Sequence, residues 1–334
     1  MVNSSANRPY IICLTPVKNE AWILDKFLQC ASLWADHIII ADQMSTDGSR
    51  EIALKYPKVQ LIDNKSEIFN EPYRQKLLLD AARQIQCQDC RKLLITLDAD
   101  EFLSGNFHES TEWDTIFKAH EGTIIQFDFL NIHPNFKEYW LGVRQMSWGL
   151  MDDNISQHQG NLIHSIRIPL PNNASVIHTE TIKVLHYQFT DWARMQAKHR
   201  WYQCYEMINR SHLHPITIFR IYHHMYGLSK KQFLTLQPEW FNFYEKKGID
   251  MFAIKKEESY YWDKQVETYF ELYGTKYFAM IDIWQNATEK FPDPRNFMQK
   301  ILHHYLLWSQ LYYAQKFPIS TIVRYFDKIL KWFF

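Results

Sequence analysis

The segment LLITLDADEF, residues 93–102, joins an apolar run directly to a cluster of acidic side chains. Residues 92–97 are mostly apolar and include a β-branched pair, as expected of a strand buried on both faces of a sheet. Asp98, Asp100 and Glu101 follow at once. Carboxylates at the end of such a strand either bind a cation or contact water as loop residues, and this segment alone leaves both interpretations open.

The chain around this segment alternates between strand and helix patterns. Short apolar runs predict strands at residues 10–14, 37–41, 59–62 and 92–97, and helical spacing separates them at 20–34, 51–56 and 73–85. Two further strands are predicted at 123–130 and 182–189, with an irregular, polar and aromatic region between them. This order predicts an α/β fold, with a mixed, mainly parallel sheet flanked by helices. We expect a catalytic domain at 1–200 and a helical, aromatic-rich C-terminal extension at 201–334.

Composition excludes several classes of protein. The 334 residues are 46% hydrophobic, which suits a sizeable core, and 37 basic residues balance 37 acidic ones, which argues against nucleic acid as a partner. No G-x-G occurs, so the Rossmann fingerprint and the P-loop are absent. No run of 18 apolar residues occurs, and the polar start MVNSSANRPY has no signal-peptide core. We therefore expect a cytoplasmic protein with reduced cysteines. Cys87 and Cys90 form a lone C-x-x-C whose expected role is structural or incidental, with redox or zinc chemistry as the alternative.

Polar groups follow three of the predicted strands where each strand ends. Ligands of open α/β sheets bind beyond these carboxyl ends. Asp98 and Asp100 lie at one such end, Asp42 at another, and the segment PVKNE (16–20) at a third. Two aspartates one residue apart can share a divalent cation. An EF-hand starting at Asp98 is excluded because Leu103 stands where that loop requires glycine. A phosphatase that uses Asp98 as its nucleophile remains an alternative, although that motif normally follows the first strand of its domain.

Three motifs resemble those of a known family. PVKNE (16–20), IIIADQMSTDGSREIA (38–53) and LDADEF (97–102) occur in the order and spacing of family 2 glycosyltransferases, which have a GT-A fold. The resemblance is firm over about residues 9–105 and fades towards residue 200, and Gln43 stands where a second aspartate is common. It implies a GT-A-like fold and an inverting, metal-dependent transfer of sugar from a nucleoside-diphosphate donor, expected to be a UDP-sugar. The acceptor would be a carbohydrate or a lipid-linked molecule.

The resemblance also implies roles for individual residues. Mn²⁺ or Mg²⁺, acting as a Lewis acid on the departing diphosphate, would be held by the motif Asp98-Ala99-Asp100. Asp100 would be the direct ligand, and Asp98 would lie near both ribose and metal. The nucleobase would be met by residues of the first two strand ends, namely Pro16, Lys18, Asn19, Glu20 and Asp42. Arg74 would lie near base and phosphate, unless it is an exposed helix arginine.

Later residues supply further candidates. His186, inside the strand pattern KVLHYQF (183–189), is either a third metal ligand or a hydrogen-bonded core histidine. Lys198 shares a helix face with Arg194, so the two form either a diphosphate clamp or a solvated basic surface. The general base is assigned to Asp153 because it lies in the irregular aromatic region. The other acidic candidates are Asp128, Asp152, Glu180 and Asp191.

The C-terminal segment 319–334 has apolar residues at helical spacing and ends in Trp-Phe-Phe. Such a helix either docks on the protein's own helical extension or lies in a membrane surface as a peripheral contact. A third possible function follows from the same aromatic helices, namely a non-catalytic scaffold that uses them to bind partners.

Overall fold

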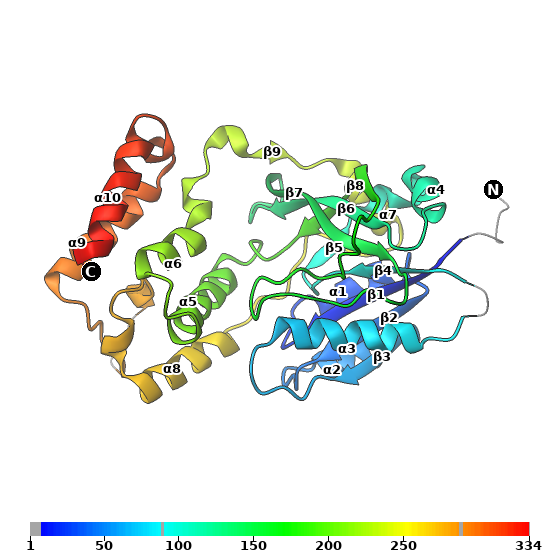
Figure 1. The fold of residues 1–334 in the computed structure, drawn as a ribbon, viewed down its shortest axis with the longest axis horizontal. Helices are drawn as coiled ribbons and strands as arrows, with labels where there is room; N and C mark the ends of the chain where they lie inside the picture. The colour runs from blue at the N-terminus through cyan, green and yellow to red at the C-terminus, as the bar shows by residue number, and fades with distance from the viewer. Residues whose placement is uncertain (1–7, 88–89, 287–289, 334) are drawn as a thin grey trace. The chain divides into compact units, whose positions relative to one another are not determined.

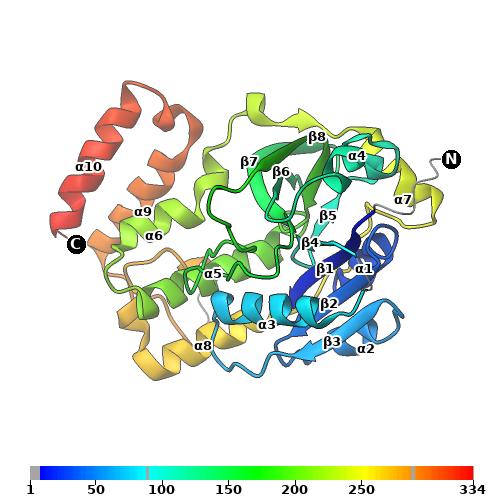
Figure 2. The ribbon, with the colours of Figure 1, turned by 45° about the vertical axis from the view of Figure 1, so that its right-hand side comes forward.

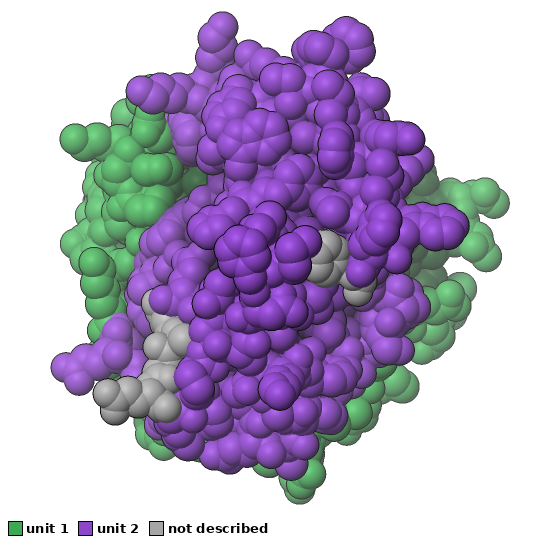
Figure 3. Space-filling model, turned by 90° about the vertical axis from the view of Figure 1, so that its left-hand side faces the viewer, with its two compact units in different colours: residues 1–190, 235–256 green, residues 191–234, 257–334 purple. Residues whose placement is uncertain are grey.

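The computed structural model describes residues 8–87, 90–286 and 290–333 (Figure 1). These residues form two compact units (Figure 3). Unit 1 comprises residues up to Thr190 together with Thr235–Lys256. Unit 2 comprises Asp191–Leu234 and the residues from Glu257 onward. Residues 235–256 therefore return to the first unit, a feature that the predicted division at residue 200 does not include.

Unit 1 is built on a mixed sheet. Its strands are β1 (Tyr10–Val17), β2 (His37–Asp42), β3 (Val59–Asp63), β4 (Lys92–Thr96), β5 (Glu101–Leu103), β6 (Ile124–Ile132), β7 (Glu138–Met151) and β8 (Val176–His186). They lie in the order β3-β2-β1-β4-β7-β6-β8-β5, and a short β9 (Leu234–Thr235) follows later in the chain. The first four pair in parallel, whereas β7 runs antiparallel to both β4 and β6. The predicted fold class, a mixed sheet flanked by helices with a helical extension, is confirmed.

Helices cover both faces of the parallel strands because successive strand residues point to opposite sides. Ile12 and Leu14 of β1 pack with apolar residues of α3 (Glu71–Gln84). Ile11 and Cys13 belong to the larger core that contains α1 (Leu24–Ala31). Asn70 caps α3 by accepting a hydrogen bond from the Tyr73 amide. The other α-helices described in this unit are α2 (Ser49–Ala53), α4 (Glu112–Phe117) and α7 (Asn242–Lys246).

The region predicted to be irregular contains the longest strand, so this prediction is wrong. β7 has 14 residues and pairs with β4 and β6. Its sequence does not alternate cleanly because its middle is exposed and irregular. Val143 is 46% exposed, Gln145 has a left-handed φ of 54°, and the register with β6 shifts at several points. The following strand, β8, also ends at His186 rather than at residue 189, since a turn forms where Thr190 N–H donates to the Tyr187 carbonyl.

The structure pairs Cys87 and Cys90 in a disulfide, with Cα atoms 5.6 Å apart. The expectation that all cysteines are reduced is therefore wrong for this pair. A spacing of three residues brings the two Cα atoms within the range that a disulfide can span. Cys13, Cys30 and Cys204 are free and buried.

Unit 2 is mainly helical, as the sequence predicts for the C-terminal part of the chain. Its principal helices are α5 (Trp192–Asn209), α6 (Pro215–Tyr222), α8 (Tyr261–Tyr273), α9 (Phe297–Gln310) and α10 (Ile319–Phe333). Figure 2 shows α9 and α10 running side by side. Ile216 and Phe219 of α6 pack against Leu302 and Leu306 of α9. Within the described residues, none of the helices combines the length and the apolar character needed to cross a membrane.

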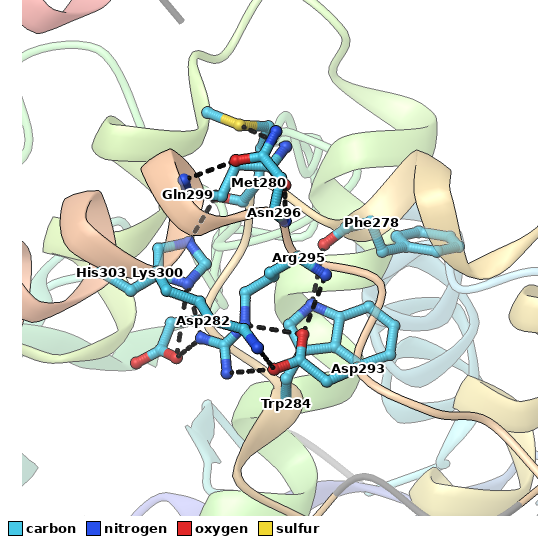
Figure 4. Close-up of polar contacts among 10 residues, drawn as sticks. All are labelled: Phe278, Met280, Asp282, Trp284, Asp293, Arg295, Asn296, Gln299, Lys300 and His303. Carbon is cyan, nitrogen blue, oxygen red and sulfur yellow. Dashed lines mark hydrogen bonds and ion pairs between the residues drawn. The ribbon is translucent and has the colours of Figure 1, made fainter.

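A partly buried polar network fixes the start of α9 (Figure 4). The Arg295 guanidinium donates to both carboxylate oxygens of Asp293 at 2.9 Å, and its Nη1 donates to His303 Nδ1 at 2.7 Å. The same nitrogen lies 3.4 Å from Asp282 Oδ1. His303 Nε2 donates to the Met280 carbonyl at 3.1 Å, so both ring nitrogens are engaged. The network joins α9 to the segment that precedes it.

Candidate functional site

The carboxyl ends of β1, β2 and β4 meet at one edge of the sheet. Val17 at the end of β1 lies opposite Asp42 at the end of β2, and Leu14 of β1 lies opposite Thr96 at the end of β4. Parallel pairing makes this juxtaposition unavoidable once the strands are in register. The polar segments that follow these strands therefore share one edge of unit 1.

Asp100, Glu101 and His186 come together beyond β4. Their ligand atoms all lie within 4.8 Å of one another, and this is the single group of this kind found among the described residues. The pairing of β5 with β8 brings them together, since Glu101 lies opposite His186 and the Tyr187 amide donates to the Asp100 carbonyl at 2.8 Å. All three side chains are buried.

The orientation of His186 suits a metal ligand. Its Nδ1 lies 2.7 Å from Asn131 Oδ1, so Nδ1 carries the proton and donates it. In the neutral imidazole Nε2 then keeps its lone pair, and this atom lies 3.7 Å from Asp100 Oδ2. Metal-binding histidines are typically oriented in this way by a hydrogen bond from the second nitrogen. The Asp100 carboxylate and a neutral imidazole are donors that Mn²⁺ accepts, and Mg²⁺ would keep more of its own waters.

Asp98 is held differently from the other acids. Its Oδ2 pairs with Arg167 Nη2 at 2.8 Å, and its amide donates to Glu101 Oε2 at 3.0 Å. Arg167 also binds Glu101, through a close contact of Nη1 with Oε2 and through Nη2 with Oε1 at 2.8 Å. Burial raises the pKa of Glu101, and the Arg167 charge opposes that shift. The guanidinium thus neutralises part of the acidic motif.

Sequence reasoning missed Arg167 as a site residue, and it named Glu101 among the carboxylates at this strand end without giving it a role of its own. Arg167 belongs to a loop between β7 and β8 that has no motif. The arginine also lies 5.4 Å from the centre of the Trp148 ring, a cation–π distance. No local pattern in the sequence indicates these contacts.

The loop that carries Arg167 is attached to the first turn of α3. Glu71 Oε2 accepts from the Ser165 amide at 2.6 Å, and the Glu71 amide donates to the Leu162 carbonyl at 3.2 Å. Glu71 Oε1 lies 3.5 Å from Arg74 Nη2. Arg74 therefore lies within one helical turn of the residue that anchors the Arg167 loop. Its assignment to base and phosphate contact stays a prediction.

Asp42 is buried and partly engaged at the second strand end. Its Oδ2 accepts from Arg50 Nη1 at 2.7 Å and from the Ser45 amide at 3.1 Å. Its Oδ1 is buried and has no hydrogen-bond partner among the residues that the structure describes. Burial lowers the pKa of Lys18, and the Asp42 carboxylate opposes that shift. An unsatisfied buried carboxylate oxygen is costly and favours a polar ligand at this position.

The first strand end is tied to the loop after β2. Asn19 has a left-handed φ of 55°, and its side chain accepts from the Thr46 amide at 2.8 Å. The Glu20 amide donates to Ser49 Oγ at 2.9 Å, and its carboxylate accepts from Trp22 Nε1 at 2.7 Å. Pro16 lies opposite Ala41 in the ladder. These contacts shape the two loops, and the predicted nucleobase contacts of Pro16, Lys18, Asn19 and Glu20 stay predictions.

The structure places Asp153 away from this edge. The neighbouring Asp152 amide donates to the Lys92 carbonyl at the start of β4, whereas Asp98 and Asp100 follow the end of that strand. Asp153 itself accepts from the Ser156 amide and hydroxyl. Asp153 thus follows the residue paired with the start of β4, and its assignment as general base stays a prediction.

Lys198 belongs to unit 2, where it lies on α5. Its Nζ is 5.9 Å from the centre of the Trp262 ring, and the Arg194 guanidinium is 4.5 Å from the same ring. The two basic residues therefore share one aromatic neighbour, and the diphosphate-clamp role of Lys198 stays a prediction.

Comparisons with known proteins give limited likenesses. No family model and no curated protein matches this chain. Glucosyl-3-phosphoglycerate synthase from Mycobacterium tuberculosis, solved with Mn²⁺ and UDP, is 17% identical with a TM-score of 0.28. That match covers 37% of this chain and 45% of the synthase, less than half of its length. 4-Diphosphocytidyl-2C-methyl-D-erythritol synthase from Anaerococcus prevotii is 12% identical with a TM-score of 0.30, over 52% of this chain and 90% of that one.

Proposed function

We propose that this protein is a metal-dependent glycosyltransferase that uses a nucleoside-diphosphate sugar, with a UDP-sugar as the expected donor. The observation that carries the proposal is the group formed by Asp100, Glu101 and His186, beyond the carboxyl end of β4 in the mixed sheet. The acceptor would be a carbohydrate or a lipid-linked molecule, and transfer would invert the anomeric centre, as the family resemblance implies.

The chain's own residues have distinct parts in this proposal. Asp100 and His186 would hold Mn²⁺ or Mg²⁺, and Asn131 keeps the imidazole in the tautomer that binds a metal. When bound, the ion would supply Lewis-acid stabilisation of the leaving diphosphate. Asp98, with Oδ1 buried and Oδ2 on Arg167, would orient the ribose side of the donor. The buried Oδ1 of Asp42 would accept from the nucleobase edge.

The proposal predicts metal-dependent binding of UDP. In calorimetry, UDP should bind more tightly with Mn²⁺ than with a chelator, and Asp100→Asn should reduce that metal dependence by about tenfold or more, because a charged ligand is lost. Asp80→Asn is a matched control, since Asp80 lies on the exposed side of α3 in a surface pair with Lys76. Equal UDP affinity with metal and with chelator in the unmodified protein would exclude the proposal.

The phosphatase alternative makes a different prediction about Asp98. A nucleophilic carboxylate would form a phosphoenzyme, which mass spectrometry after incubation with a phosphate-ester substrate would detect on Asp98. In the structure Oδ2 of Asp98 is paired with Arg167, and Oδ1 is buried. We therefore expect no covalent phosphate on Asp98, and its detection would favour the phosphatase. The scaffold hypothesis predicts no UDP binding under either condition.

A further inference from the structure

Helix α10 exposes most of its apolar residues. Trp332 is 90% exposed and Phe333 79%, and Val323 is the one residue of this helix that is fully buried. Further exposed side chains on or just before the helix are Phe317, Ile319, Ile322, Tyr325 and Phe326. Scattered exposed apolar residues are ordinary, but a helix that presents a row of large ones marks an interaction surface. Phe334 lies outside the described residues.

Polar contacts hold α10 against the neighbouring helices of unit 2. Asp327 accepts from Arg220 Nε at 3.0 Å and Nη2 at 2.9 Å, and also from the Tyr305 hydroxyl at 3.0 Å. Lys331 donates to Thr217 Oγ1 at 2.8 Å. The helix therefore packs on α6 and α9 partly through charged residues, which is the reverse of the usual arrangement for a helix in water. The side of α10 that carries Asp327 and Lys331 docks on the protein's own helices, which is one of the two expected arrangements, and the opposite side is exposed.

The exposed row continues onto α9. The rings of Tyr305 on α9 and Phe326 on α10 are 6.4 Å apart, and those of Trp308 and Tyr313 are 6.3 Å apart. Trp308 and Tyr313 are 46% and 48% exposed. We name the combined surface the aromatic face, formed by Ile301, Trp308, Tyr313, Phe317, Ile322, Tyr325, Phe326, Trp332 and Phe333.

The charges beside the aromatic face are basic. Lys316, Arg324 and Lys328 are exposed, while Asp327, the one acidic residue between 316 and 333, is turned towards Arg220. Tryptophan and tyrosine beside lysine and arginine suit the headgroup region of a membrane, where rings enter the boundary and cations meet lipid phosphates. An isologous contact with a second copy would place these basic side chains opposite one another, which opposes dimerisation.

We propose that the aromatic face docks on an anionic lipid surface, with α10 lying in the plane of the interface. The phosphate groups of the lipid would meet Arg324 and Lys328, and the exposed rings of α9 and α10 would enter the boundary region. Since α10 has 15 residues and few net positive charges, the attachment would be reversible.

Co-sedimentation of the full-length protein with vesicles tests this proposal. Phosphatidylglycerol-containing vesicles should bind it, phosphatidylcholine vesicles much less, and added salt should weaken the binding. The double variant Arg324→Glu/Lys328→Glu and the double variant Phe326→Ser/Trp332→Ser should each bind the anionic vesicles at least about tenfold more weakly. Leu272→Ser/Tyr273→Ser is the matched control, because these α8 residues are 71% and 48% exposed outside the aromatic face, and it should bind normally.

Three results would overturn the proposal. The unmodified protein would fail to sediment with anionic vesicles at low salt, or the variants of the aromatic face would bind as tightly as the control. Alternatively, ultracentrifugation would show a dimer that Phe326→Ser/Trp332→Ser abolishes, without any vesicle binding, which would assign the face to a second copy. Circular dichroism confirms that each variant is folded. The readout needs neither donor nor acceptor, so it is independent of the proposed transferase activity.

Discussion

Replacing Arg167 by methionine tests whether this residue is the counter-ion of the acidic motif. Arg167 pairs with Asp98, whose side chain is 29% exposed, and with Glu101, whose side chain is 1% exposed. The substitution keeps most of the side-chain volume beside Trp148 but leaves the buried carboxylate without its cation. Removing one partner of a buried ion pair costs about 3–5 kcal/mol.

The lower end of that range applies here, because Asp98 is partly solvated and recovers water when Arg167 is lost. We therefore expect a loss of about 3 kcal/mol in the free energy of unfolding of unit 1. For a unit of roughly 200 residues, this lowers the melting temperature by roughly 6–12 °C. Arg8→Met is the control, since Arg8 and Asp36 form a pair whose side chains are 41% and 27% exposed, and it should cost at most about 1 kcal/mol.

The counter-ion role of Arg167 is tested by measuring the calorimetric melting temperatures of four proteins, namely the unmodified chain, Arg167→Met, Glu101→Gln and the double variant. If the cost arises from an unpaired Glu101 charge, Glu101→Gln should restore much of the stability lost in Arg167→Met, with a coupling energy of about 1–3 kcal/mol. Millimolar Mn²⁺ should raise the melting temperature of Arg167→Met more than that of the unmodified protein, because the acids then lack a competing cation. Melting of Arg167→Met within about 1 °C of the unmodified protein would refute the counter-ion role. Strictly additive effects of the two substitutions would refute the assignment to Glu101.

Two further predictions concern other parts of the chain. Burial lowers the pKa of His199 from 6.5 to about 3. Below pH 6.5 the unfolded chain therefore binds a proton that the folded protein does not bind. The free energy of unfolding then decreases by about 1.4 kcal/mol for each unit by which the pH is lowered. In His199→Asn the new side chain can still donate to the Tyr222 carbonyl but does not titrate. Its urea midpoints at pH 7.5 and 5.5 should therefore differ less than those of the unmodified protein. An equal difference in the two proteins would contradict the assignment of the pH dependence to His199. A Cβ at Gly142 would lie 2.7 Å from Asn131 Nδ2, so Gly142→Ala should displace the residue that orients His186 and weaken Mn²⁺ binding by about tenfold. Gly149→Ala, whose Cβ would meet Ile125 instead, should lower stability without changing Mn²⁺ affinity, and equal Mn²⁺ affinities in the two variants would count against the role of Asn131.

The parallel half of the sheet was predictable because its strands can be recognised from their own apolar sequences. β2 and β4 are apolar on both faces, and this property depends only on burial between two layers of helices. The acidic motif was predictable for the same reason, since the residues that follow such a strand must lie at the sheet edge. β7 was not predictable, because its exposed middle and its shifted pairing with β6 remove the period of two on which strand prediction depends.

Which residues join the acidic group depends on strand pairing in the folded protein, and this pairing cannot be read from the sequence. β5 has three residues, too few for a periodic pattern, yet its antiparallel pairing with β8 places Glu101 opposite His186. His186 itself was identifiable as a polar residue in an apolar strand. Arg167 was not, because a loop arginine with no periodic neighbours is expected to be solvated, and only the folded loop brings it to Asp98.

The charges of this edge constrain the order in which ligands can bind. Asp98, Asp100 and Glu101 contribute three carboxylates, against one guanidinium from Arg167, while Arg74 is matched by Glu71. Two like charges at 4 Å repel by about 4 kcal/mol at an effective dielectric constant of 20. A diphosphate that approached Asp100 without a cation would meet such repulsion from each carboxylate that remains ionised. If the protein binds a nucleoside-diphosphate donor as proposed, the charges at this edge favour binding after, or together with, a divalent cation. UDP affinity should then rise with Mn²⁺ concentration until the proposed metal site at Asp100 is saturated.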